Sequence, residues 1–404
     1  MSRRVKQLLL LLLVLLSAAG CWNRREAEKV EYVLAVGIDL NEQGQTVISV
    51  LTPVLEALKP QTGIKQEQSK TLSVSGSTTF EAIRNYLDIT GKKLFWSHMQ
   101  VLLIGEKAAR ADVLPMINFF SSDPELRGTA TVAVVKGRAL DILESNPDIT
   151  SNPSDYLNDL LKNADLNAKS PKINYTTFSR LLTDPTGGQA FAPLVSVMDQ
   201  NQYVRQIVGT APYQGGDTKQ SVLFVTGGMA VFQGGKMAGI LNNAETRGFL
   251  WAKHMLKSAI VVVPCRDEQC SVSLELSGET GGKIKTRYSD GRVKAEIYVN
   301  VEFNIGENTG KQFAVDESII QYLEEQFNQV VQQEITLAFD KAVRKYHSDV
   351  FGFGNRLEDW NPALWKTLKD DWEARLLPEA ELEIHVEAKL RRTSRLQYSP
   401  RVVK

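Results

Sequence analysis

The stretch DESIIQYLEEQFNQVVQQEITLAFDKAVRKY, residues 316–346, carries the most regular pattern in this chain of 404 residues. Its apolar side chains recur every three or four residues, which predicts an amphipathic helix about 45 Å long. Acidic residues gather toward its start and basic residues toward its end, which is the distribution that the helix dipole favours. We therefore expect this helix to be the main helix of a C-terminal domain.

Strands are predicted on both sides of this helix. Runs rich in β-branched residues favour an antiparallel sheet before it. The expected strands of that sheet lie at 259–263, 271–276, 283–288 and 293–304. A hairpin with its turn at Gly234 and Gly235 comes earlier, followed by a helix at 244–254. After the long helix, the pattern predicts a shorter helix at 362–376 and a strand at 381–389.

Residues 22–145 alternate between predicted strands and helices, as an α+β or α/β domain does. One helix is expected at 79–89, where apolar residues keep helical spacing. Another is expected at 108–120, interrupted at Pro115. Repeated Pro and Gly residues make the following segment, 146–205, irregular.

We predict an α+β fold of several mixed sheets with flanking helices. The expected divisions are a signal peptide at 1–20, an N-terminal α+β domain at 21–205 and a C-terminal α+β domain at 206–404 that contains the long helix. The N-terminal domain could consist of two subdomains, because its last part is irregular.

The first 22 residues, MSRRVKQLLLLLLVLLSAAGCW, have the build of a secretory signal peptide. The apolar part reaches only about 20 Å as a helix, less than the ~30 Å that a membrane span requires. Cys21 directly follows small residues and looks like the lipidated cysteine of a bacterial lipoprotein, although Ala18 stands where Leu is usual. The alternative is an ordinary secreted protein in which Cys21 is incidental.

The charge balance limits the function classes. The chain has 47 basic and 47 acidic residues, three of the basic ones in the leader, so the mature chain has a net charge of about −3. This balance argues against a nucleic-acid-binding protein, which normally has a basic surface. No other apolar run is long enough to cross a membrane, so we expect a soluble body held at a membrane surface by acylated Cys21.

Two cysteines remain when Cys21 is acylated. Cys265 and Cys270 flank a short loop between two predicted strands. In an oxidising compartment we expect them to form a disulfide that closes this hairpin, with two free thiols as the alternative. A structural zinc site needs four ligands, and no further cysteine is left to supply them.

The sequence contains no pattern that indicates catalysis, a metal site or a cofactor. The histidines are scattered singly: His98, His254, His347 and His385. We interpret each as a surface histidine or one with satisfied hydrogen bonds. H-E-x-x-H, Walker A and G-x-S-x-G motifs are absent, and Asp349 alone is too little for a cation site. We therefore predict that the protein is not an enzyme, and the sequence leaves any ligand-binding residues unknown.

Several short segments spread along the chain match the sequence pattern of one protein family. In chain order they are CWNRRE (21–26), VGID (36–39), DPELR (123–127), AVF (230–232), KMAG (236–239), ETRG (245–248) with Trp251, DVFGFG (349–354) with Pro362, Trp365 and Trp372, and RRT (391–393). Together they resemble the Ger(x)C lipoproteins, the C subunits of spore germination receptors. Asn23 stands where the family usually has Asp, and Ser394 where it usually has Gly.

The resemblance implies a non-enzymatic lipoprotein that is anchored through Cys21 on the outer face of the spore inner membrane. There it would assemble with integral-membrane A- and B-type subunits into a receptor for nutrients that trigger spore germination. The family supplies no catalytic residues, and it does not identify the nutrient or its binding site.

Two other functions remain open from the sequence. One is an extracytoplasmic solute-binding lipoprotein that delivers a nutrient to a membrane receptor or transporter, which predicts a cleft between two lobes. The other is a cortex-degrading hydrolase, which requires two converging carboxylates in a cleft.

Overall fold

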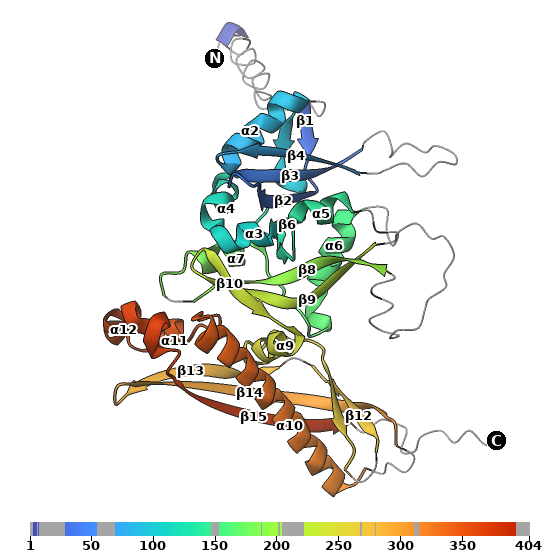
Figure 1. Cartoon of the computed structure of the whole chain (residues 1–404), viewed down its shortest axis with the longest axis vertical. Helices are drawn as coiled ribbons and strands as arrows, with labels where there is room; N and C mark the ends of the chain where they lie inside the picture. Colours follow the sequence, from blue (N-terminus) through green and yellow to red (C-terminus); the bar gives the residue numbers. More distant parts are fainter. Residues whose placement is uncertain are drawn as a thin grey trace, which may run out of the picture.

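The computed structural model of the chain describes residues 3–5, 7, 29–54, 69–145, 147, 153–186, 188–200, 203, 222–266, 269–278, 280–310 and 315–392. Within these residues, two large sheets lie one after the other along the molecule, with helices packed on them (Figure 1). The predicted α+β class, with several sheets and a long helix near the C-terminus, is confirmed.

Eight of the described strands form one mixed sheet in the order β10-β9-β8-β7-β6-β2-β3-β4. Their bounds are β2 Ala35–Leu40, β3 Thr46–Pro53, β4 Ser69–Gly76, β6 Val101–Gly105, β7 Thr131–Val135, β8 Phe191–Asp199, β9 Val222–Gln233 and β10 Lys236–Leu241. The central strands β2, β6, β7 and β8 run parallel to one another. The pairs at both ends are antiparallel.

Helices cover both faces of this sheet, because its central strands are apolar on both sides. Successive residues of β6 belong to different apolar clusters: Leu102 to one and Leu103 to the other. The first cluster includes residues of α2 (Thr79–Thr90), α3 (Glu106–Ala111), α4 (Val113–Ser122) and α7 (Tyr175–Leu182). The second includes residues of α5 (Ala139–Glu144) and α6 (Pro153–Lys162).

The large sheet continues across the boundary that the sequence suggested between residues 205 and 206. Strand β8 lies before that position and β9 after it, and the two pair antiparallel from Phe191 with Val231 to Asp199 with Val222. The expected division into domains therefore cuts between adjacent strands of one sheet. Antiparallel pairing lets a strand return beside its predecessor, so a change of composition along the chain need not end a sheet.

The helix expected at 108–120 is two helices, and the break does not lie at Pro115. Helix α3 ends before Asp112, whose side chain accepts a hydrogen bond from the N–H of Leu114 at 3.0 Å and so caps α4. Pro115 lies in the first turn of α4, where its missing N–H has no intrahelical partner to lose.

A second sheet is built around β14 (Arg292–Asn308). On one edge, β13 (Gly281–Ser289) and β12 (Ser271–Leu276) pair antiparallel with successive parts of β14. On the other edge, β15 (Glu381–Arg392) runs parallel to β14. Strand β11 (Ile260–Pro264) extends the sheet beyond β12. The antiparallel strands expected before the long helix are confirmed, and β15 joins them from the end of the described chain.

The long helix expected at 316–346 is confirmed as α10 (Glu317–Phe339), which a π-helical segment continues to Lys345. It lies across the second sheet and contacts β15 (Figure 1). The ring of Phe327 on its buried face stacks on Phe303 of β14, with ring centroids 4.7 Å apart. The apolar stripe read from the sequence is therefore the face that covers this sheet.

The segment after the long helix is more broken than the sequence suggested. In order, it contains α11 (Phe353–Trp360), α12 (Pro362–Leu368), a 3-10 turn (Lys369–Asp371) and a π-helical turn (Trp372–Leu376). The single helix expected at 362–376 is therefore three short segments. The rings of Trp365 and Trp372 pack edge to face with centroids 5.3 Å apart, so tertiary packing positions these segments.

Helix α9 (Asn243–Ala252) links the two sheets by packing against α10. The buried carboxylate of Glu334 on α10 accepts hydrogen bonds from Arg247 Nε at 2.8 Å and from Trp251 Nε1 at 3.0 Å. Gly248 lies against the backbone carbonyl of Glu334, and a β-carbon at Gly248 would clash with it. The two helices therefore touch backbone to backbone, beside an ion pair between buried Glu334 and half-buried Arg247.

We expect Gly248→Ala to lower the free energy of unfolding by about 2 kcal/mol or more, because the added methyl group overpacks the contact between α9 and α10. Urea unfolding followed by circular dichroism measures this change. Gly306→Ala on β14 is the control, because a β-carbon there would have its nearest neighbour at 3.5 Å. The control should change stability by less than about 0.5 kcal/mol. Equal effects of the two substitutions would contradict the close crossing.

Candidate functional site

Of the cysteines singled out in the sequence, Cys21 lies outside the described residues. Cys265 and Cys270 lie at the facing ends of β11 and β12, where the structure joins them by a disulfide with Cα atoms 5.3 Å apart. The N–H of Cys265 also donates to the carbonyl oxygen of Cys270 at 3.0 Å. The disulfide stays a prediction for the protein in its own compartment, and titration of thiols in the denatured protein tests it.

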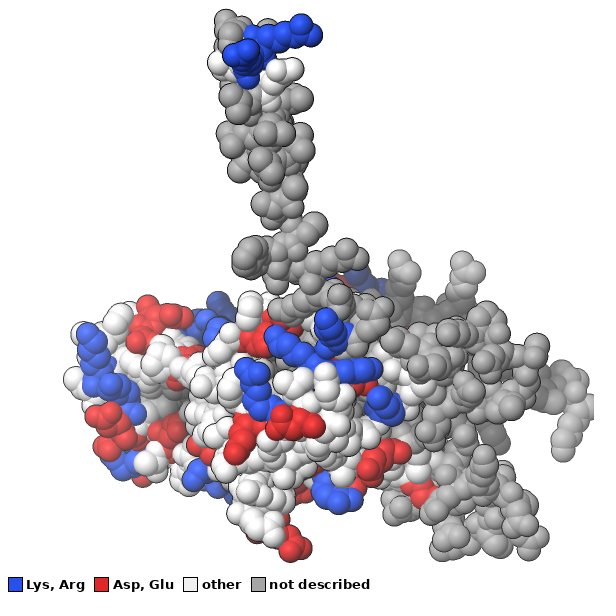
Figure 2. Space-filling model, turned by 90° about the horizontal axis from the view of Figure 1, so that it is seen from above, with Lys and Arg blue, Asp and Glu red and all other residues white. Residues whose placement is uncertain are grey.

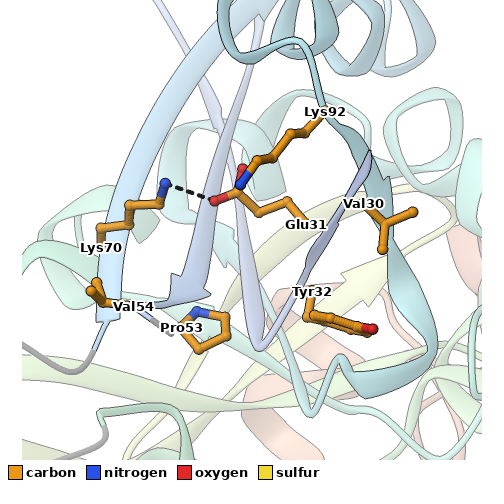
Figure 3. Close-up of a pocket in the computed structure, with 7 residues that line it drawn as sticks. All are labelled: Val30, Glu31, Tyr32, Pro53, Val54, Lys70 and Lys92. Carbon is orange, nitrogen blue, oxygen red and sulfur yellow. Dashed lines mark ion pairs between the residues drawn. The ribbon is translucent and has the colours of Figure 1, made fainter. Parts of the chain in front are cut away.

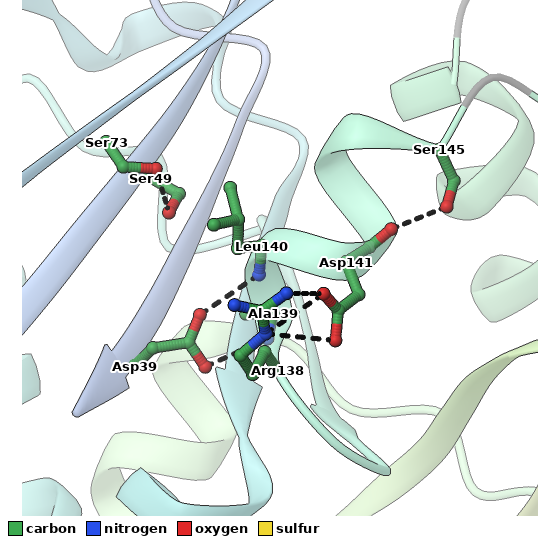
Figure 4. A network of polar contacts seen from close by, with 8 residues as sticks. All are labelled: Asp39, Ser49, Ser73, Arg138, Ala139, Leu140, Asp141 and Ser145. Atoms are coloured by element: carbon green, nitrogen blue, oxygen red, sulfur yellow. Dashed lines mark hydrogen bonds and ion pairs between the residues drawn. The ribbon is translucent and has the colours of Figure 1, made fainter. Parts of the chain in front are cut away.

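The VGID segment (36–39) holds the start of α5 in place (Figure 4). The carboxylate of Asp39, at the end of β2, accepts hydrogen bonds from the N–H groups of Ala139 at 2.9 Å and Leu140 at 3.0 Å. Burial raises the pKa of Asp39, while these two donors oppose the shift. A β-carbon at Gly37 would lie only 2.8 Å from that of Ala139, so Gly37 lets α5 approach β2. This segment therefore has a structural role.

A second buried carboxylate, Asp349, organises the loop after the long helix. It accepts hydrogen bonds from four groups: the N–H of Gly352 at 2.8 Å, Phe353 at 2.9 Å and Gly354 at 2.7 Å, and Trp372 Nε1 at 3.1 Å. Burial raises the pKa of Asp349, and these donors act in the opposite direction. The DVFGFG segment is thus a closed turn around one carboxylate.

Glu373 lies next to this turn. Its carboxylate accepts hydrogen bonds from the side-chain amides of Gln189 and, at 3.4 Å, Gln233. Burial raises the pKa of Glu373 to about 7, the two amides oppose this shift, and the charge of Asp349 adds to it. This carboxyl group therefore holds its proton to a higher pH than an ordinary Glu does.

Three of the histidines contact an aromatic ring or a carbonyl oxygen, whereas His254 has no hydrogen-bond partner among the described residues. The three contacts are His98 against the ring of Tyr32, His347 Nδ1 at 3.1 Å from the carbonyl oxygen of Glu373, and His385 stacked on Tyr298. Both ring nitrogens of His254 are buried, and neither has a hydrogen-bond partner among the described residues. The interpretation of His254 as exposed or satisfied is therefore wrong.

A small pocket of about 140 Å³ lies beside β1 (Val30–Tyr32), which pairs parallel with β5 (Lys93–Phe95) (Figure 3). Glu31 and Lys70 form an ion pair across it at 2.7 Å. Burial opposes ionisation of Glu31, but the hydrogen bond and charge of Lys70 hold its pKa below the usual value. Lys92 also lines this pocket, so its lining holds two basic residues and one acidic residue. Since its volume is below the roughly 300 Å³ of small-molecule sites, this pocket is a poor candidate for ligand binding.

The surface at this end of the molecule carries both kinds of charge. Figure 2 looks down on that end and shows Lys and Arg side chains next to Asp and Glu side chains, without a broad area of one sign. Such a surface lacks the basic stripe of a nucleic-acid interface.

The described residues contain no group of three or more His, Cys, Asp or Glu side chains placed to hold a metal ion. In the same part of the chain, no helix is long and apolar enough to cross a membrane. Of the segments that carried the family likeness, VGID, ETRG and DVFGFG each fix one turn or helix contact in the interior, whereas DPELR (123–127) lies at the surface.

Two protein-family models match the chain, one after the other. Residues 23–197 match the spore germination protein N-terminal domain, and residues 227–394 match the spore germination B3/GerAC-like C-terminal domain. The first match ends within β8 and the second begins within β9, so the junction lies between two neighbouring strands of the large sheet.

Individual relatives extend over the same length. Spore germination protein KC of Bacillus subtilis (strain 168) is 24% identical over 400 residues, which cover 96% of each chain. Spore germination protein B3 of the same strain is 24% identical and covers 89% of this chain and 90% of its own. The crystal structure of the GerBC protein has the same fold, with a TM-score of 0.54, 18% identity, and coverage of 88% of this chain and 97% of that one.

Glu373→Gln should remove a pH-dependent loss of stability. The pKa of Glu373 is raised in the folded protein, from 4.5 to about 7, so the folded state binds more protons than the unfolded state in this window. Its contribution to stability therefore falls as the pH rises through the window and stays low above it. Gln cannot ionise and avoids this loss.

We expect the stability difference between Glu373→Gln and the native protein to rise from about pH 5 to about pH 8, by ~1.4 kcal/mol for each unit of pKa shift removed. Urea unfolding across this pH range measures it. The exposed substitution Glu387→Gln on β15 is the control. A pH-independent difference for Glu373→Gln would contradict the raised pKa.

Proposed function

We propose that this chain, which belongs to the Ger(x)C family of spore germination proteins, is the lipid-anchored C subunit of a nutrient germinant receptor. Proteins of this family are receptor components and not enzymes. In this proposal, acylated Cys21 holds the protein on the outer face of the spore inner membrane. There it assembles with integral-membrane A- and B-type subunits and is required for germination triggered by nutrients. Its role is to dock on those subunits and to help assemble or couple them.

The observation that carries the proposal is the extent and order of the family matches, which run from residue 23 to 197 and from residue 227 to 394. The internal contacts add support. Asp39, Glu334 and Asp349 all direct their carboxylates to donors of the chain itself. Because these groups serve the fold, the outer surface remains for contacts with partner subunits.

The position of the leader supports the anchoring part of the proposal. The first described residue of the body, Lys29, follows Cys21 by eight residues. The end of the molecule that carries β1, β5 and α2 would therefore face the membrane (Figure 1). Its mixed charges favour contact with a protein partner over attraction to anionic lipid alone.

Deletion of the gene should abolish the response of spores to one class of nutrient, because the receptor would not assemble without this subunit. The fall in optical density of a spore suspension after addition of nutrients measures germination. Non-nutrient triggers should still work, and the native gene supplied in trans should restore the response. Normal nutrient germination in a deletion strain that has no second receptor would refute the proposal.

In the complemented strain, Cys21→Ala should move the protein out of the membrane fraction and reduce nutrient germination, because the acyl chains supply most of the membrane affinity. Immunoblots of membrane and soluble fractions measure this. Ala18→Leu is the matched control, since it introduces the residue usual in lipoproteins and should change neither readout. If the Cys21→Ala protein stays membrane-bound and functional, partner contacts and not lipid anchor it.

A further inference from the structure

Strands β11 and β15 each form an outer edge of the second sheet. An edge strand presents N–H and C=O groups that no neighbouring strand pairs, and proteins normally block such an edge. On β11, Arg247 donates to the carbonyl oxygen of Ile260 at 3.1 Å. Pro264 has no N–H, and its carbonyl oxygen accepts from Tyr322 of α10 at 3.2 Å. The chain itself therefore blocks most of the β11 edge.

On β15, α10 covers one end of the edge. The N–H of Ala388 donates to Asn328 Oδ1 at 2.9 Å. The N–H of Leu390 donates to Glu324 Oε1 at 3.0 Å. Because α10 crosses the strand obliquely (Figure 1), its side chains reach the backbone of β15 at this end. Both of these N–H groups point away from β14.

The middle of the same edge is open. Strand β15 pairs with β14 in unbroken register from Glu381 to Leu390, and the N–H groups of a strand point alternately to its two sides. The N–H groups of Leu382, Ile384 and Val386 therefore also point away from β14. Among the described strands, β15 has β14 as its one neighbour, so no described strand pairs with these three groups.

A groove of about 290 Å³ lies beside this open part of the edge. It is lined by Gln332, Thr336, Arg344, Leu382 and Ile384. Leu382 and Ile384 are half-buried and offer apolar surface to the groove. The backbone groups of every second residue of a strand lie about 6.6 Å apart, and an occupant has to match them with donors and acceptors at the same spacing. An extended polypeptide has this spacing.

The charges on the exposed face of β15 determine what kind of strand fits. This face carries Glu381, Glu383 and Glu387. Glu383 pairs with Lys294 of β14. Glu381 and Glu387 are exposed and form no ion pair with another described residue. Cationic side chains on an added strand would lie next to these two carboxylates and neutralise them.

A second copy of the same edge fits poorly. If two β15 strands paired antiparallel about Ile384, Glu381 of one copy would lie opposite Glu387 of the other. Like charges directly opposite each other destabilise a pair of strands. Lys389, which lies on the same face, already pairs with Glu324 at 3.3 Å. The edge therefore favours a basic partner strand over its own copy.

We propose that the open edge of β15, from Leu382 to Val386, accepts an extended segment of a partner polypeptide as an added strand. The backbone of the segment pairs with these residues, its apolar side chains enter the groove beside α10, and its basic side chains lie near Glu381 and Glu387. The inference deepens the proposed function and rests on it for the source of the segment, which is a partner subunit.

Fluorescence anisotropy of a labelled, capped peptide of alternating Val and Lys, titrated with the full chain in non-ionic detergent, tests the proposal. We expect a Kd below about 100 µM. The same peptide N-methylated at its central residues keeps its charge but cannot pair through its backbone, so its Kd should be about tenfold higher or more. A peptide of alternating Val and Glu should bind at least as weakly, because its charge has the wrong sign.

Ile384→Pro should raise the Kd of the Val and Lys peptide about tenfold or more. It removes an N–H that points away from β14, and proline is tolerated in an edge strand at such a position. Val262→Pro on β11 is the matched control. Its N–H also points away from the neighbouring strand, because Cys265, three residues later in the chain, bonds to β12 through its own N–H. The control should change Kd less than about twofold.

A second variant tests the edge without a change of backbone. The double substitution Glu381→Gln and Glu387→Gln should raise Kd about threefold or more and weaken its dependence on salt. Glu42→Gln, at an exposed position in the turn between β2 and β3, is its control and should leave Kd unchanged. Circular dichroism of each variant checks that the fold is retained.

Absence of binding at about 1 mM protein would overturn the proposal, as would equal binding of the N-methylated peptide. A dimer of the chain alone that Ile384→Pro dissociates would also overturn it, because a second copy would then occupy the edge. These results would leave the germination defect of the deletion strain unaffected. Conversely, a deletion strain that germinates normally would refute the receptor role and leave peptide binding intact.

Discussion

The ion pair between the buried carboxylate of Glu334 and the half-buried guanidinium of Arg247 sets the crossing of α9 and α10, and the placement of the second sheet on the first depends on this crossing. Helix α9 follows β10, the edge of the first sheet, while α10 covers the second sheet. A buried carboxylate is costly to desolvate unless it is fully paired, and Trp251 supplies a further donor to Glu334. The adjacent pair of Lys341 with Glu245, at 2.7 Å, ties the start of α9 to the π-helical continuation of α10.

The elements with a strong local pattern could be predicted from the sequence. The long helix and the strands before it follow from spacings of two, three or four residues, which reflect only which face of an element is buried. Glu334 could have been noticed by the same means, because it lies on the apolar stripe with Val331, Ile335 and Ala338. Its partner could not, since Arg247 is 87 residues away in the sequence.

The contacts of Glu373 and the continuation of the large sheet could not be predicted from local patterns, for the same reason. Gln189, which donates a hydrogen bond to the carboxylate of Glu373, is 184 residues away from it in the sequence. Likewise, Pro- and Gly-rich composition marks the segment before residue 206 as irregular, but composition does not reveal that β9 returns to pair with β8.

That pairing has a consequence for how the chain can be divided. In a fragment that ended after β8 (Phe191–Asp199), this strand would have no partner along the edge that β9 now occupies. The first five residues of β8 are buried in the whole chain. Exposed apolar edges pair with other copies of themselves and aggregate. An exchange of segments between relatives would therefore have to carry β9 and β10 with the N-terminal part, because both strands belong to the large sheet.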